Sequence, residues 1–460
     1  MPSLEDFAAT CASARDSEDG SPFASQVKLT DSIADRAVLS RESHDFHRRA
    51  GTLTDAVAEN LRRYADGASC LRVAHQPNFL PSINVVAQAG VCNALNHRLG
   101  GGHAEVFFLL DYDTNDDRRY RQASLPSLLS RRGVWSITAP PLGTCAVSMF
   151  RETPPSPEFV AACVSAVHNW ARQQLAILPR WHRHRLLRHR VLDAVELVGS
   201  MLYDAGGNAV SMADFNSIVM SWIVNRVLGL PTLFLPGSRA LRSLAGPIAM
   251  TWHSRDVIAQ ASAAARRPQA SVGGGGGGVD ASAGPLWKQC GCGTRLALTG
   301  DVFSDEMRFR CHRCGTAGVV NDRNVTDFAA AGELLPRVIA DDLLDGVAWG
   351  NVAGCDYRGG LQHYAKSAQV AHTLGLRALP VYLSARFPKA AIEHLAGREF
   401  CAALDDPDAG ETMDAARNLI ASGRVSAVMA LVWAGRVDAG QLARDMEPVG
   451  QRPRTSLSSR

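Results

Sequence analysis

Four cysteines near the middle of the chain have the spacing of metal ligands. Cys290-Gly-Cys292-Gly and Cys311-His-Arg-Cys314-Gly form two short knuckles that eighteen residues separate. Zinc is commonly held by four thiolates in a tetrahedron, and a pair on one tight turn supplies half of them. Since a closed four-thiolate site leaves no position for a substrate, the sequence predicts a structural zinc ribbon with these four ligands. Incidental thiols are the alternative.

The residues around the two knuckles predict a small, separate module. The intervening segment is expected to form a hairpin that turns at Gly300-Asp301, with apolar positions Leu296, Leu298, Met307 and Phe309. Such a module has little core of its own, so the metal would supply its folding energy. The preceding segment holds six consecutive glycines at 273–278 and is expected to be a flexible linker.

A second candidate for chemistry is the turn His75-Gln76-Pro77-Asn78, which follows a short apolar run at 71–74. In open parallel sheets, ligands bind at the carboxyl ends of strands, and the next helix can hold a phosphate at its N-terminus. An imidazole and two amides there could donate to a nucleotide during phosphoryl or adenylyl transfer. The alternative is an ordinary turn with a satisfied histidine and asparagine.

Acidic residues end the next apolar run. Asp111 and Asp113 follow EVFFLL at 105–110, and Asn115 lies close behind them. Carboxylates at that place could bind magnesium, orient an amine or act as a general base. A solvated acidic loop is the alternative.

A third candidate is a glycine-rich segment at 351–364, expected to be a loop between a strand and a helix. Its candidate ligand-binding residues are Gly354, Gly359, Gly360 and Gln362. Glycines allow a backbone to approach a ligand closely. The segment has neither the Walker spacing nor Gly-x-Gly-x-x-Gly, so by itself it identifies no particular ligand.

The elements that would position these residues alternate along the chain. Apolar periodicity predicts helices at 45–63, 83–99, 158–178, 193–203, 211–228 and 360–374. Short apolar runs predict strands at 71–74, 105–110, 232–235, 347–352 and 379–383. Residues 334–344 are expected to be helical or irregular. The alternation predicts an α/β fold: a Rossmann-like parallel sheet with helices on both faces, an inserted zinc-ribbon module and a helical C-terminal tail.

The expected organisation is one α/β body that the insert interrupts. We expect a loosely ordered segment at 1–44, the core at 45–260 and 324–388, a glycine-rich linker at 261–286, the zinc ribbon at 287–323 and a helical region at 389–460.

Composition limits the class of protein. The 460 residues carry a net charge of +3, so the chain as a whole has no general attraction for nucleic acid. The chain has no apolar run long enough to cross a membrane and does not begin like a signal peptide. Its eleven cysteines are an odd number. In a chain without a secretory signal, this favours a reducing cytoplasm over a disulfide framework.

One stretch is strongly basic. Residues 180–190, RWHRHRLLRHR, hold five arginines and three histidines. Such a density could clamp the phosphates of a nucleotide, a phosphosugar or RNA. A solvated helix face is the alternative.

Several segments in order resemble the bacillithiol-biosynthesis cysteine-adding enzymes, BshC-like ligases whose core is similar to class I aminoacyl-tRNA synthetases. The resemblance rests on RVAHQPNFLPSINVV (Arg72–Val86), FFLLDYDTND (Phe107–Asp116), the helix, strand and loop at Met212–Leu244, and the segment Glu333–Arg386. The His-x-x-Asn of the first segment is similar to the His-x-Gly-His signature of the synthetases. The cysteine cluster is additional to the family pattern.

The resemblance implies an amide-forming ligase that joins an amino acid, cysteine in that family, to a small-molecule amine acceptor, with activation by ATP or another nucleotide. His75, Gln76 and Asn78 would contact the nucleotide or the activated acyl group, and Asp111 or Asp113 would bind the amine or a metal. A zinc-ribbon protein that binds RNA or a carrier through a degenerate synthetase-like core is the second hypothesis, and a structural scaffold is a third. The sequence does not indicate an oligomeric state.

Overall fold

The computed structural model of the protein describes residues 36–115, 118–130, 132–139, 147–177, 185–264, 284–337, 353–357, 380–383 and 410–434.

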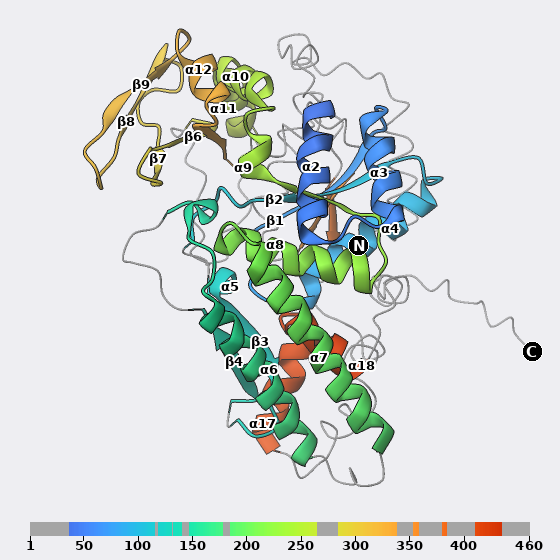
Figure 1. The fold of residues 1–460 in the computed structure, drawn as a ribbon. Helices are drawn as coiled ribbons and strands as arrows, with labels where there is room; N and C mark the ends of the chain where they lie inside the picture. Colours follow the sequence, from blue (N-terminus) through green and yellow to red (C-terminus); the bar gives the residue numbers. More distant parts are fainter. Residues whose placement is uncertain are drawn as a thin grey trace, which may run out of the picture.

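A five-stranded parallel sheet lies at the centre (Figure 1). Its strands are β1 (Cys70–His75), β2 (Ala104–Leu109), β5 (Leu233–Pro236), β11 (Ala353–Tyr357) and β12 (Pro380–Leu383). They lie in the order β12-β11-β1-β2-β5, and every neighbouring pair is parallel. This is the strand order of a doubly wound sheet, with the change of direction between β1 and β11. The predicted parallel sheet among helices is confirmed, and strands on both sides of the insert build it.

Alternation along β2 explains why helices cover both faces. Val106 and Phe108 point into one apolar cluster, with α3 (Asp55–Ala65), whereas Phe107 and Leu109 point into a second cluster. That second cluster contains α4 (Ile83–Arg98) and α8 (Met212–Ser221). Successive side chains of a strand point to opposite faces, so a strand with apolar side chains on both faces must be covered on both.

The first predicted helix, at 45–63, is wrong as a single element. The structure has α2 (Arg36–Ala50) and α3, separated by a turn in which Gly51 has φ +66°. Thr54 caps the second helix, because its hydroxyl accepts from the N–H of Val57. Four-residue spacing of apolar side chains does not reveal a break whose two sides both face the core.

Two long helices extend away from the sheet (Figure 1). They are α6 (Pro157–Ile177) and α7 (Arg185–Asn208). The hairpin β3–β4 (Gln122–Pro126, Val134–Thr138) packs against α6, and the helix α18 (Ala427–Ala434) packs against α7. The helix α17 (Gly410–Ala421) packs against the hairpin. Trp170 and Trp433 meet edge to face at 6.1 Å in this part of the core. The C-terminal region is therefore helical in its described part.

Short elements join these parts. They are α5 (Arg118–Arg121), η2 (Met149–Arg151), the π-helix η4 (Trp222–Val227), α9 (Gly237–Ala240), α10 (Ala245–His253) and α11 (Arg255–Ala264). The predicted helix at 211–228 thus changes from α8 to η4 at Trp222.

The cysteine module, residues 284–337, forms its own small sheets. Strands β6 (Leu286–Gln289), β7 (Arg295–Ala297) and β10 (Leu334–Pro336) make one sheet, and β8 (Glu306–Arg310) with β9 (Ala317–Asn321) makes a hairpin, followed by α12 (Val325–Ala330). The predicted hairpin between 296–298 and 307–309 is confirmed only near its turn, where Thr299 and Arg308 form an antiparallel bridge that joins the two sheets. As strands, β7 pairs with β6 and β8 pairs with β9.

Two expectations for the second half of the core also need correction. Residues 334–336 form β10 of the cysteine module, neither helical nor irregular. Residues 353–357 form β11, so the strand lies where the glycine-rich loop was expected. The predicted strand at 347–352 and helix at 360–374 lie outside the described residues.

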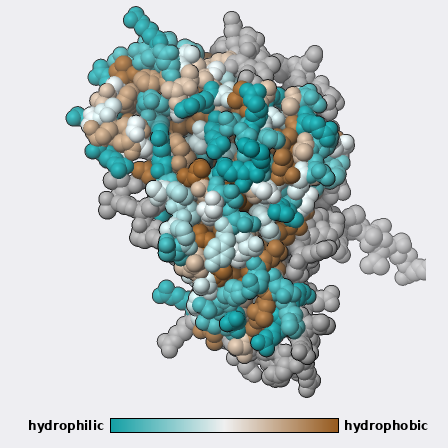
Figure 2. Space-filling view, in the orientation of Figure 1, coloured by the Kyte–Doolittle hydropathy of each residue, from teal (hydrophilic) through white to brown (hydrophobic). Residues whose placement is uncertain are grey.

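No described helix is long and apolar enough to cross a membrane. On the face drawn in Figure 2, hydrophobic residues lie in separate small patches among hydrophilic ones.

Candidate functional site

The carboxyl ends of β1, β2 and β5 bring together residues that are far apart in the sequence. His75 is the last residue of β1, Asp111 and Asp113 follow β2, and Ser238 follows β5. In parallel α/β sheets, ligands bind at this edge. Three of the predicted catalytic residues, His75, Asp111 and Asp113, therefore share one edge.

Gln76 and Asp113 are in direct contact. The Gln76 side-chain amide donates to Oδ2 of Asp113, while Oδ1 accepts the N–H of Thr114 at 2.8 Å. The Nδ1 atom of His75 lies 2.9 Å from the carbonyl oxygen of Gln76. The β1 turn and the β2 loop, predicted separately, thus form one hydrogen-bonded group.

Asn78 is buried, with 2% of its surface exposed, yet neither its side-chain oxygen nor its nitrogen has a hydrogen-bond partner within the described structure. Such a group costs about 1–3 kcal/mol unless a ligand or water satisfies it. Two residues further on, Leu80 has φ +41°. Among the described residues, every other positive φ is at a glycine. Strained backbone of this kind clusters at ligand-binding turns.

The first amides of α4 do not face an open site. Ile83 and Asn84 donate their N–H groups to the carbonyls of Val425 and Gly423, at 2.9 and 3.1 Å, and the N–H of Val85 bonds to Ser82. The segment between α17 and α18 therefore occupies the N-terminus of α4. The expectation that this helix end binds a phosphate is not met.

Asp111 is held by the strand end opposite it. Ser238 donates both its backbone N–H, at 2.7 Å, and its hydroxyl to the Asp111 carboxylate. Gly237 makes this approach possible, because a Cβ there would lie 2.7 Å from the carbonyl oxygen of Leu109. Burial raises the pKa of Asp111 from its ordinary 3.8 to about 6, although the two hydrogen bonds from Ser238 oppose the shift.

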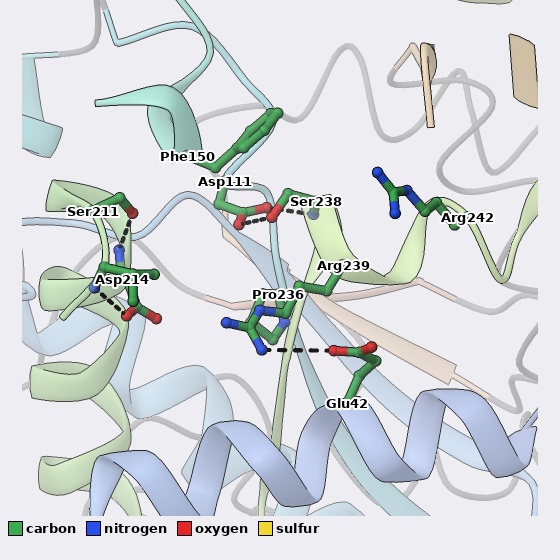
Figure 3. Close-up of a pocket in the computed structure, with 10 residues that line it drawn as sticks. Glu42, Asp111, Phe150, Ser211, Asp214, Pro236, Ser238, Arg239 and Arg242 are labelled. Carbon is green, nitrogen blue, oxygen red and sulfur yellow. Dashed lines mark hydrogen bonds and ion pairs between the residues drawn. The ribbon is translucent and has the colours of Figure 1, made fainter. Parts of the chain in front are cut away.

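A cavity of about 430 Å³ opens beside Asp111 (Figure 3). Drug-sized ligands occupy cavities of about 300–1,000 Å³. Asp214 in its wall is neutralised by Arg49, whose Nη2 atom lies 2.9 Å from Oδ1. Glu42 from α2 lies 3.7 Å from Arg239.

Arg242 completes the charged lining of this cavity. It lies on the turn after α9, is exposed, and makes no ion pair with any residue in the described part of the chain. The cavity therefore presents one buried carboxyl group of raised pKa together with an unpaired guanidinium, which suits a small molecule with an amine and an acid group.

The four cysteines of the module form a compact cluster. The sulfur atoms of Cys290, Cys292, Cys311 and Cys314 all lie within 4.8 Å of one another, and two pairs are 3.5 Å apart. A tetrahedral zinc site with bonds of about 2.3 Å places its sulfurs about 3.8 Å apart. The predicted four ligands are thus together at a distance compatible with a metal ion.

The two knuckles share a local pattern that fits thiolates. A glycine of positive φ follows Cys292 and Cys314, and the hydroxyl of the next residue, Thr294 or Thr316, lies 3.2 Å from the sulfur. This contact lowers the pKa of both thiols, that of Cys314 to about 6. Deprotonated sulfur is the form that binds metal.

Other predicted site residues lie elsewhere. Gly354 is inside β11, paired with Arg72 of β1 and Pro380 of β12, so it is not in a ligand loop. Gly359, Gly360 and Gln362 lie outside the described residues. Residues 180–184 of the basic stretch also lie outside them, and Arg190 donates to the carbonyl of Trp433.

Sequence reasoning missed Ser238, Arg239 and Arg242. The only signal was that PGSRALR follows a predicted strand, as polar strand-end residues of a parallel sheet do. It also missed Arg295, which forms an ion pair with Asp113.

No family model matches the chain, and no curated protein matches it.

Proposed function

We propose that the protein is a ligase that forms a C–N bond between an activated amino acid and a small-molecule amine acceptor. The observation that carries the proposal is the buried Asp111 carboxyl group, whose pKa is raised to about 6, beside a cavity lined by arginines at the carboxyl edge of the sheet. A general base works best when its pKa lies near the operating pH.

The proposed reaction needs such a base. The lone pair of the amine attacks the acyl carbon, a C–N bond forms, and the C–O bond to the phosphate leaving group breaks. Before the attack, Asp111 takes a proton from the ammonium group of the acceptor, because an ammonium has no lone pair. The second proton, which the nitrogen loses as the amide forms, passes to solvent. Arg242 and Arg239 would bind an acid group of the acceptor and so place its nitrogen.

Activation would use ATP or another nucleotide, whose α-phosphate the amino-acid carboxylate attacks with release of pyrophosphate. His75 and the unsatisfied amide of Asn78 are the proposed contacts to the nucleotide or the acyl group. The first N–H groups of α4 already donate to backbone carbonyls, so they are not free to bind a phosphate. We therefore assign nucleotide binding to these side chains and not to the N-terminus of the helix.

The cysteine cluster is proposed to hold a structural zinc ion. The four-sulfur ligand set and the distances between the sulfurs support this role, and a closed set of four thiolates offers no position for substrate. Zinc would fix the two knuckles and take no part in the bond-forming step.

The test is amino-acid-dependent pyrophosphate exchange, followed by amide formation with a panel of amine acceptors. Asp111→Asn should retain exchange but lose amide formation by at least 100-fold, because only the second step needs the base. His75→Ala should lose exchange itself. The matched control is Asp193→Asn on α7, which should behave as wild type. Absence of exchange with all twenty amino acids and of product with every acceptor would contradict the proposal.

A further inference from the structure

The cysteine module docks on the strand-end site instead of only being tethered beside the core. Gly293 lies at the end of the first knuckle, just before β7, and its carbonyl accepts the N–H of Ser148 at 3.1 Å. The Ser148 hydroxyl donates to Gln289 of β6 at 2.8 Å. Figure 1 shows the module, in yellow to orange, beside α9, α10 and α11.

The loop that receives the module also belongs to the site. Ser148 forms an isolated bridge with Thr114, Met149 donates its N–H to the carbonyl of Asp113 at 2.8 Å, and Phe150 donates to that of Asp111 at 2.9 Å. The backbone of both acidic residues is therefore held by a segment that contacts the first knuckle directly.

Arg295 makes the second connection, through side chains. It lies three residues after Cys292, and its guanidinium forms an ion pair with Oδ1 of Asp113. Two guanidinium groups lie over the ring of Trp287, that of Arg295 at 4.8 Å from its centroid and that of Arg337 at 4.1 Å. This stacking restrains the arginine, so its position depends on the pairing of β6 with β7.

The first knuckle fixes that pairing. Cys290 donates its N–H to the carbonyl of Thr294 at 2.9 Å, and Gly293 donates to that of Cys290, also at 2.9 Å. These bonds close a turn whose two sulfurs, on Cys290 and Cys292, lie within the cluster. Four thiolates so close together repel one another unless a cation holds them, so metal binding stabilises this turn.

We propose that a thiophilic divalent metal in the cysteine cluster sets the position of Asp113 and Gln76 through Arg295, which is a positioning residue for the strand-end site. The contacts run from Cys292 through the turn to Arg295, then to Asp113, and from its second oxygen to Gln76, the neighbour of His75. Only the consequence for turnover rests on the proposed ligase function. The coupling itself is a property of the folded chain and can be measured without substrate.

The loop after β2 offers a direct measure of this coupling. Four backbone N–H groups between 110 and 115 are hydrogen-bonded. Those of Leu110, Asp113 and Asn115 donate to the carbonyls of His75, Leu110 and Val147, and that of Thr114 donates to the Asp113 carboxylate. Their hydrogen exchange reports whether the loop is held.

The experiment measures hydrogen exchange by mass spectrometry on the full chain, loaded with Zn²⁺ or treated with a chelator, and zinc content by elemental analysis. Chelation of the wild type should speed exchange in peptides covering 110–115 by at least tenfold. Arg295→Ala should speed exchange there with zinc still bound, and chelation should then add less than it adds in the wild type, because only the contacts of Ser148 with the module remain to be lost. Arg295→Lys should restore part of the protection.

Arg308→Ala is the matched control, because Arg308 is an exposed arginine of the same module whose side chain pairs with Glu306 of its own strand. It should leave 110–115 unchanged. Asp113→Asn removes the ion pair from the other side and should speed exchange at 110–115 with zinc retained. This variant covers the case in which Arg295→Ala loses its metal. Unchanged exchange at 110–115 on chelation, or in Asp113→Asn, would overturn the proposal, whether or not the ligase activity is found.

Discussion

Ser238 holds Asp111 across two adjacent strand ends, with its N–H 2.7 Å from one carboxylate oxygen and its hydroxyl bonded to the other. The two residues are 127 positions apart in the chain. They meet because β2 and β5 are parallel neighbours, with Leu109 opposite Pro236, so the residues after each strand emerge at the same edge.

Asp111→Asn should stabilise the protein at high pH. The pKa of Asp111 is raised to about 6 in the folded state, so the folded chain binds this proton more tightly than the unfolded chain. The stabilising contribution is present below the ordinary pKa of 3.8 and is lost as the pH rises through about 6. At pH 8 the variant should gain about 1–3 kcal/mol of unfolding free energy. Urea titrations at pH 8 and pH 4 check this, and a gain that does not shrink at pH 4 would contradict it.

Gly237→Ala should damage the site by steric overlap. A Cβ there would lie 2.6 Å from the Tyr112 ring and 2.7 Å from the carbonyl of Leu109. We expect a loss of about 1–3 kcal/mol in stability, the usual cost of overpacking. The matched control is Gly207→Ala in α7, where nothing lies within 4 Å and alanine favours the helix. Thermal melts of the two variants should move in opposite directions.

His47 should make the fold sensitive to acid. Its Nε2 accepts the N–H of Phe234 at 2.8 Å and its Nδ1 lies 2.8 Å from the Thr52 hydroxyl, both in the core. Burial lowers the pKa of His47 from 6.5 to about 3, so its stabilising contribution is complete above about pH 6.5 and is lost as the pH falls toward 3. At pH 5 the loss should be about 2 kcal/mol.

His47→Gln checks this assignment, because a glutamine oxygen can accept the Phe234 N–H without titrating. The variant should be less stable than wild type at pH 7.5, and the difference should narrow at pH 5. A difference that is the same at both values would assign the acid sensitivity to other groups.

Metal removal should unfold the cysteine module before the sheet. Cys292→Ser and Cys311→Ser should each lower zinc content and expose sites to protease within residues 284–337, because the cluster has four ligands and none to spare. Cys163→Ala, in α6 and remote from the cluster, should retain its zinc. Full zinc content in both serine variants would show that the cluster is not the metal site.

The sequence alone determined the elements that carry strong local signals. The largely apolar runs of β1, β2 and β5 and the helix α4 were predicted within one or two residues, because burial on both faces of the sheet favours long apolar runs. The four cysteines were found from spacing, since each knuckle is a local turn.

Pairing between distant segments was decided only by the tertiary structure. Residues 353–357 contain Gly354 and are closely followed by Gly359 and Gly360, so the sequence predicted a loop there. They form β11 because β1 and β12 supply partners on both sides. The partner of β8 is β9 and not β7 for the same reason, since many antiparallel registers satisfy one alternating pattern.

The candidate site divides in the same way. Residue type pointed to His75, Asp111, Asp113 and the cysteines, because few side chains can do acid–base chemistry or bind zinc. The contacts of Ser238 with Asp111 and of Arg295 with Asp113 span more than a hundred residues and carry no local pattern. Burial and partners, which set the pKa of Asp111, exist only once the strands are side by side.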